Sequence, residues 1–172
     1  MYPIHDFSNL NDYLPILNGS LAADIIILLM TYYTNVFNIK TLKAWYEKYR
    51  LSAVIADVLI LVIGIIIARY FYSMFKIKWN IVKFLSLVLV IQIIHDYLFY
   101  LFFKSVPRGT NKMLDLFKDY AKEIGGKAIL GDSFMIILAV LLSSYFAGLS
   151  QNTNIILCVC LVYLIPYVLY TR

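Results

Sequence analysis

Charged side chains are scarce in this sequence. Asp, Glu, Lys and Arg make up 15% of its 172 residues, whereas a typical soluble domain contains about 25%. Apolar residues reach 62%, and the mean hydropathy is +0.80. A soluble chain of this composition would have too few polar groups to cover its surface. The composition therefore excludes a water-soluble fold and predicts a single membrane domain over residues 1–172.

The sequence also lacks the motifs of several catalytic and channel classes. It has no His-Glu-x-x-His run, no serine nucleophile elbow, no phosphate-binding glycine loop and no Thr-Val-Gly-Tyr-Gly filter. Cys158 and Cys160, the only cysteines, are two residues apart on an expected helix and point to different faces. They are interpreted as packing residues. We therefore predict no catalytic residue and no cofactor, and leave the question of a metal open.

Five segments are apolar enough to cross a bilayer, which requires about 20 residues in a helix. They are residues 21–39, 51–75, 81–103, 128–149 and 154–170. The first contains Asp24 and other polar residues, so four spans are the alternative. Residues 1–20 contain no Lys or Arg, unlike a cleaved signal peptide, and are expected to form an extramembrane or interfacial lead. The predicted fold class is all-α, a polytopic transmembrane helix bundle.

One connection between spans has the pattern of an amphipathic helix. Its apolar residues recur with the spacing of one helix face: Met113, Leu116, Phe117, Tyr120 and Ile124. Charged residues, including Lys118 and Lys122, cover the other face. Thr110 or Asn111 is expected to cap the helix over residues 112–124, and Gly125–Gly126 to end it. This helix is too short to span and is predicted to lie on the cytoplasmic membrane surface; the alternative is a short helix packed on the bundle.

Basic residues are distributed unevenly between the two sides of the predicted bundle. Eleven of the 15 lie in residues 40–50 and 104–127 or at Arg172. Because cytoplasmic loops are rich in Lys and Arg, five spans would place the N-terminus outside and the C-terminus in the cytoplasm. If the first segment does not span, the N-terminus lies inside. The expected partners are the bilayer, its anionic headgroups, and copies of this chain or other membrane proteins, but not nucleic acid.

Ionisable residues inside the predicted spans are the candidates for a functional site. Asp57, Asp96 and Asp132 lie on three spans, all about 7–11 Å below the same boundary at about 1.5 Å per residue. Gln92 and His95 share a helix face with Asp96. An ionisable group in hydrocarbon costs at least about 2.5–3.5 kcal/mol, so we expect these residues to form one buried polar cluster.

The sequence also predicts where three further polar residues, Arg108, Ser133 and Asp24, lie relative to this cluster. Arg108 follows Pro107 in the next connection and is expected to reach Asp96 or Asp132. Ser133 is included in the cluster beside Asp132, whereas Asp24 is expected near the opposite membrane face. Small residues accompany Asp57 and Asp132 on their helix faces, which favours close helix–helix contacts there. These stripes are Ala53, Gly64 and Ala68 in one helix, and Ala139, Ser143 and Ala147 in the other.

Three functions are compatible with a buried Asp/His cluster. The sequence favours a non-enzymatic membrane component, which acts by assembly or membrane association and uses the cluster as structural hydrogen bonds. The alternative is a small ion- or proton-coupled transporter or channel, in which His95 titrates near neutral pH. A membrane-embedded, metal-dependent enzyme comes third, with His95 and the carboxylates as ligands. A cavity reaching the cluster would favour transport or catalysis.

Residues 92–133 contain four short motifs. They are Gln-x-x-His-Asp-x-x-Phe-Tyr, Pro-Arg-Gly-x-Asn, Asp-x-x-Lys-x-Tyr-Ala-x-Glu-x-Gly and Gly-Asp-Ser. The pattern resembles an uncharacterised group of small multi-pass membrane proteins from giant, nucleocytoplasmic large DNA viruses. The resemblance implies a virion or host membrane as the location, and it implies no reaction.

Overall fold

The computed structural model describes residues 1–34 and 39–170, and every regular element in this part of the chain is a helix. A short 3-10 turn, η1 (Leu10–Asp12), leads into the first long helix. The elements that follow are α1 (Tyr13–Tyr33), α2 (Lys40–Tyr49), α3 (Leu51–Met74), α4 (Ile81–Ser105), α5 (Lys112–Ile124), η2 (Gly125–Lys127), α6 (Ala128–Phe146) and α7 (Gln151–Leu169). The predicted all-α class is confirmed.

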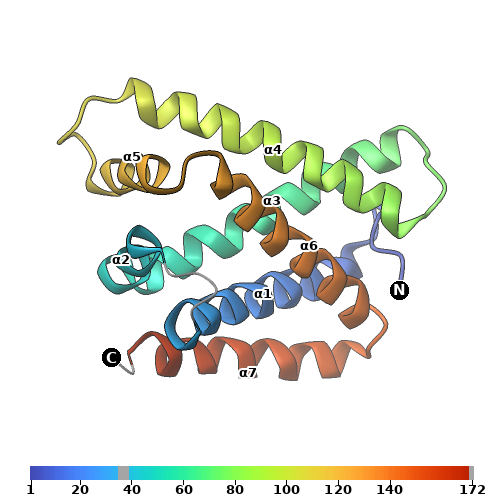
Figure 1. Ribbon diagram of the computed structural model, residues 1–172. Helices are drawn as coiled ribbons and strands as arrows, with labels where there is room; N and C mark the ends of the chain where they lie inside the picture. Colours follow the sequence, from blue (N-terminus) through green and yellow to red (C-terminus); the bar gives the residue numbers. More distant parts are fainter. Residues whose placement is uncertain (35–38, 171–172) are drawn as a thin grey trace.

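Five helical stretches of the described residues are long and apolar enough to cross a membrane, and they contain α1, α3, α4, α6 and α7. The chain is therefore an integral membrane protein. Figure 1 shows α1 in the middle of the bundle, with α7 on one side of it and α3 and α6 on the other. α1 is the most buried of the five. The other helices expose apolar side chains such as Leu98 and Val159, as contact with lipid requires.

The first span begins earlier than predicted. α1 starts at Tyr13, so residues 13–20 are helical and continuous with the first candidate span. Pro15 lies in the first turn, where its missing N–H breaks no helical hydrogen bond. The polar Asn18 is fully buried because its side-chain amide donates to the carbonyl oxygen of Asn154 in α7, at 2.8 Å. Of the predicted end of this span, residues 35–38 lie outside the described residues.

The segment before α1 is tied to one end of the bundle by hydrogen bonds. The guanidinium of Arg69 in α3 is fully buried, donates to the carbonyl oxygen of Asn9 at 2.9 Å and pairs with Asp12 at 3.3 Å. Ser144 in α6 donates its hydroxyl to the carbonyl oxygen of Tyr2 at 2.6 Å. The segment therefore closes this end of the helix bundle.

α1 and α6 cross at very short range. A Cβ atom added to Gly19 would lie 2.2 Å from the Ser143 hydroxyl and 2.7 Å from the Ala139 carbonyl oxygen. Ala139 and Ser143 are fully buried. The predicted stripe of small residues on α6 is therefore a helix–helix contact, and its partner is α1.

α2 and α5 lie together at the other end of the bundle (Figure 1). The Glu123 carboxylate, at the end of α5, accepts hydrogen bonds from the backbone N–H groups of Lys40 and Thr41 at 3.0 and 2.9 Å. It thereby caps the first turn of α2. The two basic connections are thus on one side, as predicted. α5 also has the predicted bounds, with Asn111 accepting from the Met113 N–H at 2.8 Å.

Candidate functional site

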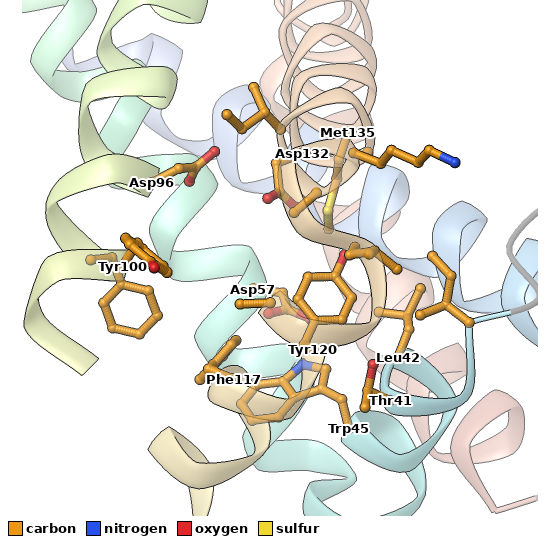
Figure 2. Close-up of a pocket in the computed structure, with 18 of the residues that line it drawn as sticks. Thr41, Leu42, Trp45, Asp57, Asp96, Tyr100, Phe117, Tyr120, Asp132 and Met135 are labelled. Carbon is orange, nitrogen blue, oxygen red and sulfur yellow. Dashed lines mark hydrogen bonds between the residues drawn. The ribbon is translucent and has the colours of Figure 1, made fainter. Parts of the chain in front are cut away.

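A cavity of about 1640 Å³ lies among α2, α3, α4, α5 and α6, at the end of the bundle where α2 and α5 pack. Five predicted cluster residues line it: Asp57, Gln92, His95, Asp96 and Asp132. Figure 2 shows carboxylates from three helices around this space, with the Tyr120 ring beside Asp57. Most of the remaining wall is apolar or aromatic. The structure therefore brings these five residues to one site.

Asp57 is positioned by the short helix α2. The indole N–H of Trp45 donates to Asp57 Oδ2 at 2.9 Å. Arg50, with a φ of 46°, separates α2 from α3 and turns the chain sharply between them. Trp45 also packs on Phe117 of α5, with ring centroids 4.9 Å apart. α2 therefore fixes one carboxylate and part of the aromatic wall.

Asp24 belongs to the same polar region, and its predicted location near the opposite face is wrong. Its side chain is fully buried, and Oδ1 accepts a hydrogen bond from the Tyr46 hydroxyl at 3.0 Å. The same hydroxyl also interacts with Asp57. Because α1 begins at Tyr13, Asp24 lies near the middle of the helix and not at its start. Burial raises the pKa of Tyr46 well above its ordinary value, so this side chain stays a neutral donor.

The α4 residues form one hydrogen-bonded group. Gln92 Nε2 donates to Asp96 Oδ1 at 2.7 Å. His95 Nδ1 lies 3.3 Å from the same oxygen, and the His95 ring stacks on Phe99 with centroids 5.9 Å apart. Asp96 Oδ2 is buried and has no hydrogen-bond partner among the described residues. One oxygen of this carboxylate is thus buried and unsatisfied within the described residues.

Asp132, in α6, lies close enough to Asp57 and Asp96 for the three negative charges to repel one another. Within residues 1–34 and 39–170, no ion pair engages Asp24, Asp57 or Asp132. Lys127 is the only described Lys or Arg that lines the cavity, and it is exposed. The carboxylates therefore exceed the cationic side chains available to balance them.

Two predicted members are not part of this cluster. Arg108 pairs with Asp119 of α5 at 2.6 Å, and both side chains are about half exposed. The chain turns at Gly109, whose φ is 88°, and its N–H donates to Asp115 at 2.9 Å, so this loop folds onto α5. Ser133 does not line the cavity, because successive helical side chains point about 100° apart.

α5 covers the cavity with its apolar face. Phe117 and Tyr120 line the space, and Phe117 contacts Phe99 of α4 with centroids 5.1 Å apart. Lys118 turns inward, where its ammonium donates to the Val106 carbonyl oxygen at the end of α4. Lys122 is exposed. α5 therefore packs on the bundle, and its position on the membrane surface stays a prediction.

The residues that sequence reasoning missed are Asp24, Trp45 and Tyr46. A signal for α2 was present, since apolar and aromatic residues recur at helical spacing in residues 42–49: Leu42, Trp45, Tyr46 and Tyr49. That spacing predicts a short helix with one face toward the bundle. The hydrogen bonds to Asp24 and Asp57 depend on how this helix folds back, which spacing alone does not give.

The described part of the chain contains no group of three His, Cys, Asp or Glu side chains arranged to hold a metal ion. The hypothesis of a metal centre built from His95 and the carboxylates therefore lacks a ligand set there. No protein-family model, curated protein or solved structure matches this chain.

Proposed function

We propose that this protein is a small, non-enzymatic membrane transporter that binds a cation among its buried carboxylates. One observation supports the proposal above others. Asp57, Asp96 and Asp132, from three membrane-spanning helices, line one cavity with no Lys or Arg ion pair among the described residues. Ionisable groups inside a membrane bundle are costly and are typical of substrate or ion pathways.

The charge balance of the cavity suggests the mechanism. Carboxylates that share a site of low dielectric constant do not all stay ionised unless a cation or protons balance them. A cation that enters the cavity would bind between the Asp96 and Asp132 carboxylates, and would release protons held there. Loss of the cation would reverse the exchange. Cation binding and proton release are then coupled through the same side chains.

The distribution of basic residues supports an orientation for this transport. α2, α5 and most Lys and Arg residues share one end of the bundle, and such an end faces the cytoplasm. The N-terminus would then lie outside. In this orientation the cavity lies at the cytoplasmic end of the bundle, under α2 and α5, and the segment tied to Arg69 closes the outer end.

Proton movement in proteoliposomes tests the proposal. Liposomes containing the purified protein and an internal pH-sensitive dye receive Na⁺, K⁺ or tetraethylammonium outside, and we expect at least one cation to drive proton movement. Asp132→Asn should abolish that signal because it removes a cavity charge. Asp119→Asn removes an exposed carboxylate outside the cavity and should retain it. Wild-type liposomes that behave like empty ones with every cation would contradict the proposal.

A structural component of a virion or host membrane is the second candidate. The observation that favours it is that Trp45 of α2 donates to Asp57 of α3, which fixes two neighbouring helices, while Gln92 satisfies one oxygen of Asp96 within α4. In this function Asp96→Ala would destabilise the bundle more than Asp96→Asn, which keeps a hydrogen-bonding group. Full stability of Asp96→Asn, combined with loss of cation-driven proton movement, would favour transport over this candidate.

A further inference from the structure

We infer that the cavity binds an amphipathic organic cation, a quaternary or protonated nitrogen or a similar onium centre carrying a bulky apolar body. The inference rests on the proposed function and names the substrate class of the same site. It follows from three properties of the cavity, which are its size, its aromatic wall and its excess of carboxylates.

The size of the cavity exceeds what an inorganic ion requires. Its volume is about 1640 Å³, whereas pockets for drug-sized molecules measure about 300–1,000 Å³. A bare divalent ion such as Ca²⁺ or Mg²⁺ needs about six oxygen ligands at short range. The walls supply mainly apolar side chains, and the described residues contain no metal-holding group of His, Cys, Asp or Glu. The dimensions and the lining therefore fit an organic molecule.

The aromatic wall is suited to a cation with an apolar body. α2, α4 and α5 all contribute rings to the lining: Trp45, Tyr97, Phe99, Tyr100, Phe103, Phe117 and Tyr120. Ring faces attract organic cations electrostatically, most strongly where water is excluded. Their carbon surface also buries the apolar body of the ligand. Figure 2 shows Trp45, Phe117 and Tyr120 on one side of the space, with Tyr100 opposite them.

The carboxylates fix where the cationic centre would lie. Asp132 and Asp96 point toward the same space from α6 and α4 (Figure 2), and Asp96 Oδ2 has no partner among the described residues. The Tyr120 ring lines the same space, beside Asp57 (Figure 2). The positive centre would sit between the two carboxylates, and the apolar body would extend toward Phe117 and Trp45.

A lipid acyl chain is the competing occupant, because the walls are largely apolar. An acyl chain supplies no counter-charge to the carboxylates, and ionised carboxylates would repel an anionic headgroup. The charge of the bound molecule therefore distinguishes an organic cation from a lipid as the occupant of the cavity. Tetraphenylphosphonium and tetraphenylborate have nearly the same size and shape but opposite charge, and a cation site must distinguish between them.

The experiment is titration calorimetry of the full-length protein in detergent micelles with each of these two ions, after subtraction of binding to empty micelles. We expect saturable binding of tetraphenylphosphonium and none of tetraphenylborate. Asp132→Asn should weaken tetraphenylphosphonium binding by about tenfold or more, since a lost charged contact is worth over about 1.4 kcal/mol. Tyr120→Leu, which keeps an apolar side chain, should weaken it several-fold. Asp119→Asn should bind like the wild type.

The possible outcomes separate this inference from the proposed function. Equal binding of both ions, or co-purified phospholipid that blocks both, would overturn the inference in favour of a lipid-filled cavity. Absence of tetraphenylphosphonium binding, together with Na⁺- or K⁺-driven proton movement that depends on Asp132, would overturn the inference and leave the proposed function standing. Absence of both binding and proton movement would overturn both.

Discussion

At the scale of single residues, polar atoms in short segments hold buried groups of the spanning helices in place. Trp45 does this for Asp57, through an indole N–H at 2.9 Å. At the opposite end His5 acts through its ring. The ring stacks on Trp79 with centroids 5.0 Å apart and packs edge-on against Tyr72 of α3 at 5.3 Å. Each interaction involves one donor or one ring, so each can be tested by one substitution.

Trp45→Phe should destabilise the protein by about 1 kcal/mol, because it removes the hydrogen bond to Asp57 and preserves most of the ring packing. Trp79→Phe is the matched control, since Trp79 acts by ring stacking on His5, and it should have a smaller effect. Thermal unfolding in detergent gives both values. If the two variants unfold at the same temperature, the Trp45 hydrogen bond contributes nothing measurable.

The free energy of unfolding should fall as the pH drops below about 6.5, because the folded protein holds His5 in its neutral form. Burial lowers the pKa of His5 from its ordinary value of 6.5, and the positive charge of Arg69 lowers it further. The negative charges of Asp6 and Asp12 raise the pKa and offset part of this effect. The unfolded chain therefore binds this proton first, and acid favours unfolding. Asp6 has a lowered pKa, held mainly by hydrogen bonds from Ser8, and loses its contribution only below about 3.8, its ordinary value.

The variant His5→Phe separates the contribution of His5 to the pH dependence of stability from that of other groups. It retains a ring against Trp79 and cannot titrate, so the unfolding temperature should vary less with pH between 5 and 7.5 than in the wild type. Unfolding curves at several pH values in one detergent give the comparison. Identical pH profiles for the two proteins would assign the dependence to other groups.

At the scale of helices, Gly19 in the α1–α6 crossing is the most closely packed glycine of the described residues. Gly19→Ala should destabilise the bundle by about 1–3 kcal/mol, because the added Cβ would meet the Ser143 backbone nitrogen at 2.6 Å. Gly131→Ala is the control, since nothing lies within 4 Å of its added Cβ and Ala favours a helix. Calorimetric unfolding of both variants is the measurement. A Gly19→Ala protein as stable as Gly131→Ala would show that the helices separate at low cost.

The predicted bounds of the later spans were close to those of α3, α4, α6 and α7, because the bilayer demands long apolar helices whatever their partners. Hydropathy did not predict the start of α1. The polar Asn18 argues against a membrane span unless its hydrogen bond to Asn154 in α7 is known. Convergence of Asp57, Asp96 and Asp132 followed from their shared depth, their small or polar helix faces and the cost of a lone carboxylate in lipid. The pairing of Arg108 with Asp119 depends instead on the turn at Gly109.

At the scale of the whole molecule, the two ends of the bundle differ. Hydrogen bonds from Arg69 and Ser144 to the N-terminal segment close one end. α2 and α5 cover the other end, which contains the cavity and most of the basic residues. The proposed transport would use this difference, since a transporter's binding site must be reached from one side at a time.

Single-cysteine labelling tests this arrangement in the membrane. Cys158 and Cys160 are first replaced by Ala, and a cysteine is then placed at Lys43, Lys112 or Lys78. An impermeant maleimide should label the first two only from the cytoplasmic side, and the third only from outside. Labelling of Lys43 and Lys112 from opposite sides would contradict the five-span topology.

The contact between Gly19 and Ser143 also has a mechanical consequence. With almost no side chain between them, α1 and α6 approach closely at this point, which would act as a pivot, and Asp132 lies eleven residues from it along α6. At about 1.5 Å per residue this is a lever arm of about 16 Å, so a tilt of about 10° would move Asp132 by about 3 Å. The closed end sits close to the pivot and would move little. A small rocking of α6 would thus be amplified into making or breaking one contact in the cavity.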